Sequence, residues 1–546
     1  MTNNNKYIGL WEQGTIPPVQ DFQEIKNLLM QILKPLYVLD INGKTGIGYN
    51  GNAFLGKNTK QKIKSHKIKA YIPAMGLENL GDSVFKKRHS IKYPYIAGAM
   101  ANGISSVKMV KKMAENGMLG FFGSGGLLIN EVEHAIIQLK KELNISLPFG
   151  FNLIHSQGDY DLEMAVVNLY LKHKIRLISA AAFMRITLPL VLYRLKGIYR
   201  DSNDKIITPN KIIGKVSRIE VAKQFFSPAP EKIVKILFQK KLITETEAEL
   251  SRFIPMAQDI TAEADSGGHT DNRPSLTVFP IMQALKHEFN EKYKYQEHLC
   301  VGFAGGIATP ESSGACFQMG GDYILTGSIN QSCIEAGTSE HVRQILAQAK
   351  QADVAMAPSA NMFEMGAKVQ VLKRGTMFPL KAQKLYRLYK TYNSFNEIDE
   401  KIKKEIEKKI FQTSVQEKWE QTKDFFKTRN IREIEKAEND PKHKMALLFR
   451  SYLGLSSKWA LQGNEKKKMD YQIWCGPSMG AFNYWVKKSF LESHKNRKVA
   501  EIGLNLLFGA CFYNRVYWLK AQNIDIPLDL LKFKPIKKND IFKLIV

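Results

Sequence analysis

The chain has 546 residues, 44% of them hydrophobic, and it carries 79 lysines and arginines against 52 aspartates and glutamates. This length exceeds the size at which one hydrophobic core usually stops growing, so we expect one large domain with substantial additions. The N-terminus lacks the basic-then-apolar order of a signal peptide, and no uncharged apolar run reaches the ~18 residues needed to cross a bilayer. We therefore expect a soluble protein with no membrane partner.

The formal net charge of +27 favours acidic partners through long-range attraction. The lysines are scattered and form no recognisable DNA- or RNA-binding motif, so we expect no nucleic acid partner. Solvated helix faces in a lysine-rich protein are the simplest explanation of the charge. Docking of an acidic carrier protein is the alternative that stays open.

The cysteines are odd in number and widely spread: Cys300, Cys316, Cys333, Cys475 and Cys511. No pair has the short spacing of a zinc site or of a thioredoxin-type motif. We expect reduced thiols in the core of a cytoplasmic protein, and no metal.

Residues 1–85 predict a small strand-and-turn domain. A short apolar run at 37–41 indicates a strand, and the glycine- and asparagine-rich run at 46–51 indicates a turn. A lysine-rich run follows near residues 57–69. No chemistry can be assigned to this part.

From residue 93 an apolar strand, a small-residue turn and an amphipathic helix alternate repeatedly. We predict helices over 107–114, 131–143 and 163–173, and strands over 95–100, 118–123, 149–154, 177–182, 211–216, 255–260, 300–304 and 322–326. These suffice for a (β/α)8 barrel over residues 86–378, with a helical insertion near 229–250. A doubly wound open sheet is the competitor, but it places its glycine-rich turn first, whereas here the glycines come late.

Beyond residue 379 the composition shifts to Lys, Glu, Leu and aromatic residues, which predicts a mostly helical C-terminal extension over 379–546 that acts as a cap or substrate region. One island, residues 471–485, is too rich in glycine and aromatic residues for a plain surface helix.

The residues TAEADSGGHT at 261–270 give the clearest candidate site. His269 ends a Gly-Gly turn, Gly267 and Gly268, at a predicted strand-to-helix junction, where an imidazole can move a proton at a ligand held against the glycines. The competing interpretation is an ordinary surface-turn histidine. Glu263 is a candidate ligand contact, but together with Asp265 it is also placed to cap the following helix.

Small residues at other strand ends suit a phosphate and a planar ring. Backbone amides and hydroxyls near the last two strands match the phosphate site of many barrels: Gly305, Gly306, Thr326, Gly327 and Ser328. Asn152 ends its strand and can offer an amide to a ring edge. We expect the ring face to be lined by residues that, taken singly, also suit core packing: Ala97, Gly98, Ala99, Met100 and Ser179.

Five segments together resemble the PfaD family. They are YIAGAMA at 95–101, GFNLIH at 150–155, TAEADSGGHTDNRP at 261–274, AGGIATP at 304–310 and WCGPSMG at 474–480. The members of this family are trans-acting enoyl reductases of polyunsaturated fatty acid and polyketide synthases, related to nitronate monooxygenases. The resemblance covers nearly the whole chain, and its most specific part is the block at 261–274.

This resemblance implies an FMN-dependent reductase that takes electrons from NADPH or NADH and reduces the α,β-double bond of an enoyl thioester on an acyl carrier protein. It implies that His269 transfers a proton, that Gly305, Gly306, Gly327 and Ser328 hold the phosphate, and that Asn152 contacts the flavin. A homodimer is an assembly that the sequence leaves open. Two other functions also stay open, a nitronate monooxygenase-like flavin oxidase and a non-catalytic barrel that binds carriers.

Overall fold

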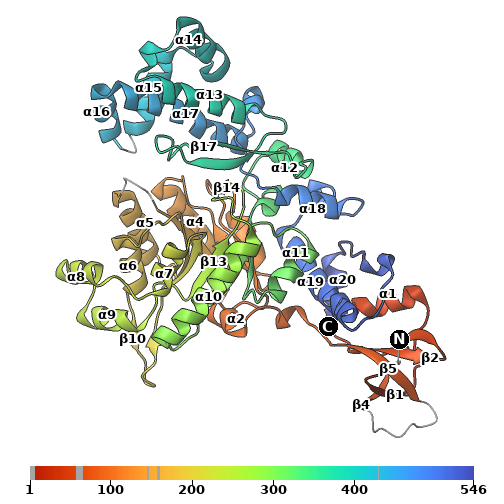
Figure 1. The fold of residues 1–546 in the computed structure, drawn as a ribbon. Helices are drawn as coiled ribbons and strands as arrows, with labels where there is room; N and C mark the ends of the chain where they lie inside the picture. The colour runs from red at the N-terminus through yellow and green to blue at the C-terminus, as the bar shows by residue number, and fades with distance from the viewer. Residues whose placement is uncertain (1–6, 57–64, 144–146, 156–159, 428–429, 546) are drawn as a thin grey trace.

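The computed structural model describes residues 7–56, 65–143, 147–155, 160–427 and 430–545. Figure 1 shows a small sheet near both termini, a barrel in the middle, and a helical part above the barrel. The predicted α/β barrel with an N-terminal strand region and a helical C-terminal region is therefore confirmed. Of the lysine-rich run at 57–69, residues 57–64 lie outside the described ranges.

The N-terminal region is an antiparallel sheet in the order β3-β2-β5-β1-β4 with one helix beside it. Its elements are β1 (Gly9–Gln13), α1 (Phe22–Met30), β2 (Leu36–Ile41), β3 (Lys44–Gly48), β4 (Gly51–Leu55) and β5 (Ser65–Ile72). The turn predicted at 46–51 is wrong in part, because β3 and β4 occupy most of it. Within β3 the position of Gly48 has no room for a side chain, because a Cβ there would come 2.8 Å from the buried ring of Trp11.

Within the described ranges, eight parallel strands close into a barrel in chain order, and the last strand pairs with the first. They are β6 (Tyr95–Ala97), β7 (Leu119–Phe122), β8 (Gly150–Ile154), β9 (Leu177–Ala181), β12 (Lys211–Val216), β13 (Asp259–Glu263), β15 (Cys300–Ala304) and β16 (Ile324–Thr326).

The helices that follow the first seven barrel strands pack outside them. They are α3 (Val107–Ala114), α4 (Ile129–Glu142), α5 (Tyr160–Lys172), α6 (Leu188–Leu195), α7 (Ile219–Phe226), α10 (Ser275–Tyr293) and α11 (Pro310–Gln318). The helical excursion expected near 229–250 consists of α8 (Glu231–Gln239) and α9 (Glu245–Leu250). Two smaller additions are α2 (Ser83–Arg88) and the hairpin of β10 (Tyr199–Arg200) and β11 (Ile206–Ile207).

One predicted strand is displaced. The strand placed at 255–260 runs instead over Asp259–Glu263. The residues before it are held by the end of α7, because the amides of Met256 and Ala257 donate to the carbonyls of Ser227 and Phe225. Apolar composition alone does not distinguish such a lead-in segment from the strand that follows it.

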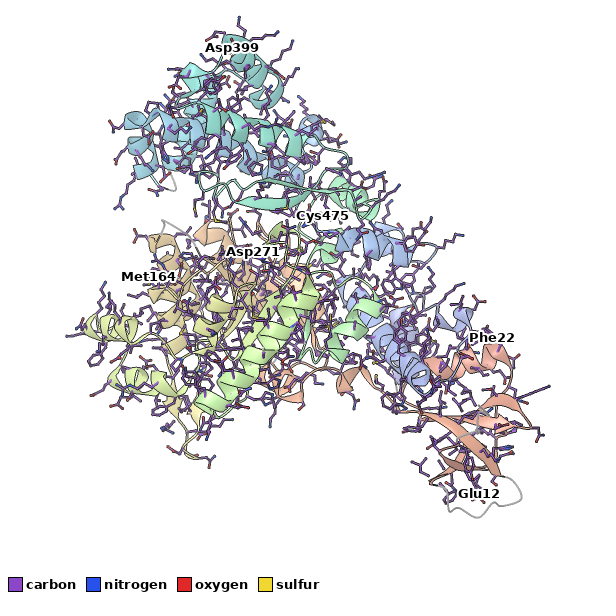
Figure 2. The ribbon with its side chains drawn as sticks, in the orientation of Figure 1. Glu12, Phe22, Met164, Asp271, Asp399 and Cys475 are labelled. Atoms are coloured by element: carbon purple, nitrogen blue, oxygen red, sulfur yellow. The ribbon has the colours of Figure 1, made fainter. Side chains whose placement is uncertain are left out.

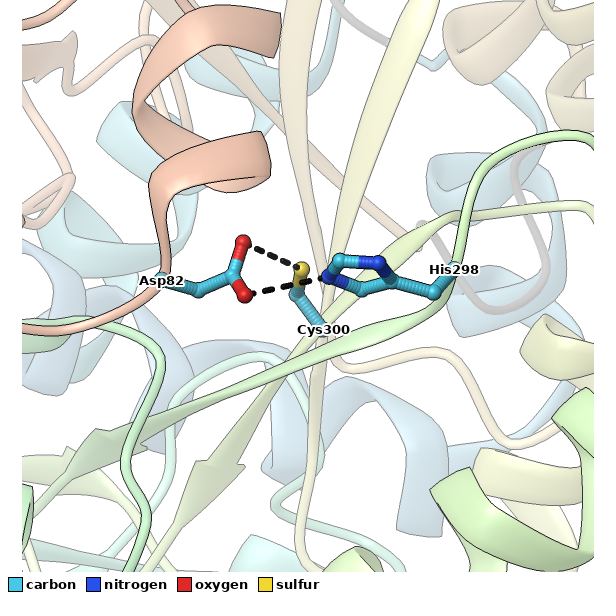
Figure 3. Close-up of side chains that lie close together, drawn as sticks. All are labelled: Asp82, His298 and Cys300. Atoms are coloured by element: carbon cyan, nitrogen blue, oxygen red, sulfur yellow. Dashed lines mark hydrogen bonds and ion pairs between the residues drawn. The ribbon is translucent and has the colours of Figure 1, made fainter.

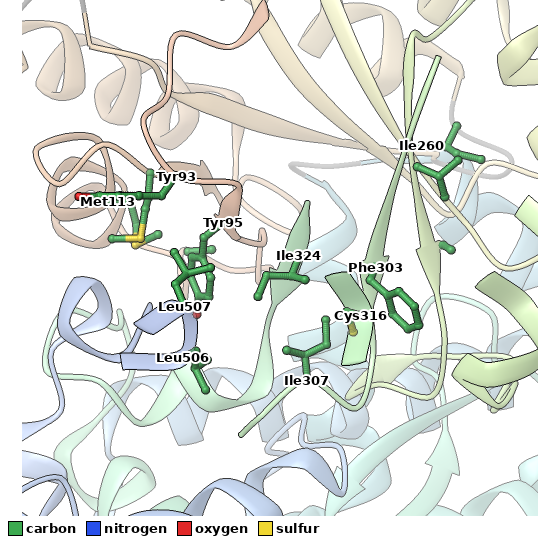
Figure 4. Close-up of a cluster of buried hydrophobic side chains, with 14 of the residues drawn as sticks. Tyr93, Tyr95, Met113, Ile260, Phe303, Ile307, Cys316, Ile324, Leu506 and Leu507 are labelled. Carbon is green, nitrogen blue, oxygen red and sulfur yellow. The ribbon is translucent and has the colours of Figure 1, made fainter. Parts of the chain in front are cut away.

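The eighth helix position of the barrel is filled by α19 (Val499–Ala521), which contacts α11, α3 and β6. Glycines permit the close approach, since a Cβ on Gly503 would lie 3.0 Å from the ring of Tyr95, and one on Gly509 would lie 2.5 Å from Pro310. Figure 4 shows Leu506 and Leu507 of this helix in the same apolar cluster as Tyr95. The division of the chain at residues 85 and 378 stays a prediction, and α19 packs as part of the barrel wall.

Between β16 and α19 the chain makes a long excursion above the barrel (Figure 1). Its elements are α12 (Glu340–Ala347), β17 (Val354–Pro358), β18 (Lys368–Leu372), α13 (Phe378–Thr391), α14 (Glu400–Ile406), α15 (Val415–Lys427), α16 (Arg432–Asn439), α17 (Pro441–Gln462) and α18 (Ser478–Val486). Its helices α13–α17 enclose a core of their own around Phe363, Phe449 and Tyr452. A last helix, α20 (Lys538–Ile545), contacts α19.

Arg515 and Gln522 at the end of α19 tie the N-terminal sheet to the barrel. The buried Arg515 guanidinium donates to carbonyls near the end of α1, with Nη2 2.7 Å from the oxygen of Lys34. The Gln522 side chain bonds both backbone groups of Tyr71 on β5. All five cysteines are buried free thiols. Across the described ranges, no helix combines the length and the apolar character that crossing a lipid bilayer requires.

The N-terminal end of the barrel is closed by a buried charged network. Asp259, at the start of β13, accepts from Arg88 and lies 2.8 Å from His89 Nε2. Burial raises the pKa of Asp259, but its attraction to Arg88 and His89 outweighs burial and holds that pKa below its usual value. Arg88 also bonds Glu297, at 2.9 Å.

Beside this network lie Asp82, His298 and Cys300 (Figure 3). Asp82 is 3.1 Å from His298 Nε2 and 3.8 Å from the Cys300 sulfur. Burial raises the pKa of Cys300, so the thiol stays protonated and donates to Asp82. Arg88 Nη1 donates to the same sulfur, at 3.6 Å.

Replacing Asp259 by Asn should destabilise the barrel by about 3 kcal/mol, because it leaves the buried Arg88 without its counter-charge and His89 without its carboxylate partner. The measurement is the denaturant midpoint or the melting temperature of the two proteins. Glu297→Gln is the matched control: this carboxylate is 34% exposed, so its loss should cost less. Equal effects of the two substitutions on stability would contradict the assignment of Asp259 as the central carboxylate of this network.

Candidate functional site

The predicted site residues gather at the C-terminal ends of the barrel strands. They are Ala97, Gly98, Ala99 and Met100 on and after β6, Asn152 on β8, Ser179 on β9, Glu263 on β13, Gly267, Gly268 and His269 after it, Gly305 and Gly306 after β15, and Thr326, Gly327 and Ser328 at the end of β16. Barrels of this kind build their active sites at this end. In the structure the predicted residues lie together around the C-terminal opening of the barrel, which we call the mouth.

The loop that carries His269 is held at both ends. Gly268 and His269 form the short strand β14, which pairs antiparallel with β18 from the excursion above the barrel. Further along the loop, Asp271 accepts from Arg218, at 2.9 Å and 3.0 Å, and from Ser217. Hydrogen bonding by Arg218 lowers the pKa of Asp271 to about 2, so this anchor stays charged.

His269 keeps much of its surface exposed, although protein atoms surround the imidazole on several sides. This desolvation lowers the pKa of His269, and Lys215 lowers it further, while a hydrogen bond with Asn361 and the charge of Glu263 act in the opposite direction. The net effect keeps the imidazole neutral near pH 7. Asn361 comes from the turn after β17, and no local sequence pattern connected it with His269.

The glycine- and aromatic-rich island at 471–485 packs directly on the same loop. A Cβ on Gly267 would lie 2.9 Å from the amide nitrogen of Gly476 and 2.9 Å from Ser328 Oγ. Trp474 pairs with Val371 of β18 and lies near Gly268. In Figure 2, Cys475 and Asp271 are labelled where the helical part meets the barrel. The unusual composition of the island is explained by this close contact.

Three glycines have distinct roles at the rim. Gly305, with φ +87°, packs closely on the His269 loop, since a Cβ there would lie 2.7 Å from the carbonyl carbon of Ala264. At Gly306 and Gly327 a Cβ would meet no atom within 4 Å. The amides of Gly306 and Gly327 donate to no other backbone group among the described residues. Open space and free N–H donors at two neighbouring strand ends form a cradle for an anion.

Asn152 braces the loop after β7. Its Oδ1 atom accepts from the amide and hydroxyl of Ser124, each at 2.7 Å, and from the amide of Gly125 at 3.2 Å. Its Nδ2 atom donates to no described residue and remains a donor for a ligand. Ser179 is its register partner on β9 and is buried.

Other predicted residues contribute mainly through the backbone. Gly98 donates to the carbonyl of Thr326, at 2.9 Å, which joins the ends of β6 and β16. The Thr326 hydroxyl is occupied by Tyr95, at 2.6 Å, and by Asn330, at 3.0 Å. Ser328 Oγ accepts from Gly476, so these side chains hold the rim in shape.

An ion pair lies inside the mouth. Lys215 Nζ on β12 is 2.7 Å from Glu263 Oε1 on β13. The sequence pattern identified Glu263 as a candidate but not Lys215. The only sequence signal pointing to Lys215 is a lysine close to the end of an otherwise apolar strand.

This fold and site define the class of the protein: a closed (β/α)8 barrel with two glycine amides left unpaired among the described residues, a neutral histidine and an ion pair at its C-terminal mouth. Comparisons with known proteins narrow that class. The chain is similar to the solved enoyl reductase domain of MlnA from the macrolactin cluster of Bacillus amyloliquefaciens, with 41% identity, a TM-score of 0.77, and coverage of 82% of this chain and 100% of that domain.

Two longer relatives agree with this result. The polyketide biosynthesis protein PksE of Bacillus subtilis is 47% identical over 79% of this chain and 56% of its own length. The polyketide biosynthesis protein ThaF of Burkholderia thailandensis is 41% identical over 80% of this chain and 37% of its own. The chain thus spans about half or less of the length of these curated relatives.

Two further matches extend the picture. A component of the polyunsaturated fatty acid synthase of Thraustochytrium sp. is 42% identical over 83% of this chain and 30% of its own length. Residues 392–471 match the model of the [acyl-carrier-protein] S-malonyltransferase inserted helical domain.

The chain belongs to the PfaD-like family of enoyl reductases, because it covers a whole solved member at 41% identity. The resemblance predicted from the five sequence segments is confirmed.

Replacing Asn361 by Ala should lower the pKa of His269 further, because the hydrogen bond that favours the charged ring is lost. Asn361→Asp should raise it, because a carboxylate favours imidazolium. NMR titration of the His269 ring, assigned with a His269→Asn variant, measures both shifts. Shifts in the same direction, or none, would show that Asn361 does not control this group.

Proposed function

We propose that this protein is an FMN-dependent enoyl reductase that uses NADPH or NADH to reduce the α,β-double bond of acyl-carrier-bound enoyl thioesters. The observation that carries the proposal is the 41% identity to the enoyl reductase domain of MlnA over that entire domain. The protein would act within polyketide or polyunsaturated fatty acid synthesis, as the names of the longer relatives suggest.

The residues at the mouth fit the phosphate of FMN. Gly306 and Gly327 offer amide donors in front of open space, and the hydroxyl of Ser328 is next to them. A phosphate replaces missing hydrogen-bond partners for such amides without moving the backbone. Gly305 contributes by setting the close approach of the His269 loop.

The same mouth offers contacts for a planar ring. We propose that the free Nδ2 of Asn152 donates to the ring edge and that the ring is lined by Ala97–Met100, Ser179, Gly267 and Gly268. Thr326 supports this wall through its hydrogen bonds to Tyr95 and Asn330. Lys215 and Glu263 place an ion pair at the strand ends of the same mouth.

When bound, FMN supplies hydride transfer from NAD(P)H to the β-carbon of the enoyl thioester. We propose that His269 provides the proton that the α-carbon needs. The ring takes up a proton from solvent and delivers it as imidazolium, whose acidity the lowered pKa increases, and it then returns to the neutral form. Asn361 orients that ring. In sum, enoyl thioester, NAD(P)H and one proton give the saturated thioester and NAD(P)+.

The positive surface and the helical excursion support an acyl carrier protein as the partner. Carrier proteins are acidic, and a net charge of +27 attracts them. Residues 392–471 match a domain inserted in an enzyme that acts on a carrier protein. A cytoplasmic location and a homodimer stay predictions.

Anaerobic half-reactions test the proposed activity. NADPH should bleach the flavin of the purified protein, and a crotonyl or longer carrier-bound enoyl thioester should restore its colour. His269→Ala should keep FMN but slow the second half-reaction roughly 100-fold, because the proton donor is lost. Failure of every enoyl thioester to restore the colour would refute the reductase, and rapid recolouring by oxygen alone would favour an oxidase.

Gly327→Val tests the phosphate cradle. The backbone at Gly327 has a negative φ, −126°, and a Cβ there meets nothing within 4 Å. The variant should fold with an unchanged melting temperature in the absence of FMN, yet it should bind FMN at least roughly tenfold more weakly, because the new side chain fills the cradle. Gly267→Val is the contrasting control, since its side chain would strike Gly476 and Ser328. If Gly327→Val binds FMN as tightly as the wild type, the placement of the phosphate at this position is wrong.

A further inference from the structure

The pair of Lys215 and Glu263 is set on the inner face of the barrel. Side chains two residues apart on a strand point the same way. Two residues before Lys215, Ile213 belongs to the interior cluster, and two residues before Glu263, Thr261 bonds the interior Tyr323. Both charged side chains therefore point toward the barrel axis, one layer above the packed floor.

Small residues surround this pair. Ala304 on β15 is the register partner of Glu263. On the other side, Gly214 of β12 pairs with Ala180 of β9, which brings Lys215 level with Ala181. With alanines on both flanks, the two long charged side chains are the main groups that a ligand entering the mouth would meet at this level.

The pair has no evident structural task. The barrel interior below the pair is already filled by the side chains of Phe121, Tyr323 and Leu325. The side chains of Lys215 and Glu263 are 16% and 22% exposed, so each has lost most of its hydration for an attraction that is worth little at partly exposed sites. Charges held this way at the ligand end of a barrel are characteristic of functional sites.

The pair also acts on the proposed proton donor. Glu263 raises and Lys215 lowers the pKa of His269, so both charges are felt where hydride and proton transfer would occur. Ser266 Oγ bonds Glu263 Oε1, the oxygen that contacts Lys215, at 3.3 Å. This contact fixes the carboxylate, and through it the ammonium group.

We propose that Lys215, held by Glu263, is the cation that stabilises the negative charge left on the flavin ring by reduction. This inference rests on the proposed function. Reduction adds a hydride, two electrons and one proton, from NAD(P)H to a neutral oxidised ring, which becomes an anion, while NAD(P)+ leaves. No proton moves to or from Lys215, whose contribution is electrostatic.

The midpoint potential of bound FMN tests this role without measuring turnover. Lys215→Met should lower the potential, because the reduced ring loses its counter-charge. Glu263→Gln should raise it, because Lys215 is then no longer neutralised. Lys215→Arg should stay close to the wild type. For each shifted variant we expect at least a tenfold change in the affinity ratio of reduced to oxidised FMN, about 30 mV for a two-electron couple.

Lys223→Met is the matched control, because Lys223 is an exposed lysine on α7, the helix that follows β12. It should leave the potential unchanged. The inference is overturned if Lys215→Met and Glu263→Gln shift the potential in the same direction or leave it unchanged. If Lys215→Met does not fold, two other variants test the inference. Glu263→Gln must raise the midpoint potential, and Lys215→Arg must leave it close to that of the wild type.

The two proposals fail separately. A wild-type protein that takes up no FMN overturns the proposed function and this inference together. A wild-type protein that binds FMN and reduces enoyl thioesters, with variants of unchanged potential, overturns the role of Lys215 alone.

Discussion

The backbone pairing of β14 with β18 is the contact on which the site depends. β14 has only two residues, Gly268 and His269, and β18 belongs to the excursion between the last barrel strand and α19. Gln370 of β18 donates to Asp265 in the same loop, at 2.5 Å, and Trp474 pairs with Val371 on the same strand. A two-residue strand has no stability of its own. His269 is therefore positioned by the excursion as much as by the barrel.

The two ends of the barrel handle charge in opposite ways. At the N-terminal end, Asp259 is fully buried and bonds both Arg88 and His89. This network closes the barrel, and its charged groups are not available to a ligand. At the C-terminal end, Gly306 and Gly327 keep free amides, and the ion pair of Lys215 and Glu263 stays partly open to solvent. Backbone donors that face solvent indicate a binding surface, whereas a buried network of paired charges indicates a structural one.

Much of this arrangement could be read from sequence because the relevant patterns are local. Alternating apolar strands and amphipathic helices defined the barrel, and residues 261–274 placed the glycines and His269 within one loop. The sequence did not identify Lys215 as a site residue, because the strand residues 211–216 do not show which side faces inward. The sequence did not identify Asn361 either, because only the β17–β18 hairpin brings it to His269. The role of α19 also depends on tertiary contacts, although its apolar residues on all sides indicate a buried helix.

The placement of α19 makes the completion of the helical layer around the barrel a late event in the synthesis of the polypeptide. β16 ends at Thr326, yet the helix that covers β6 and α11 begins only at Val499. On the ribosome, the apolar surfaces of Tyr95 and Met118 must wait for the whole excursion to be translated before they are covered. Nascent chains would hold an exposed groove during that interval, a natural point for chaperones to engage and for premature termination to produce aggregates.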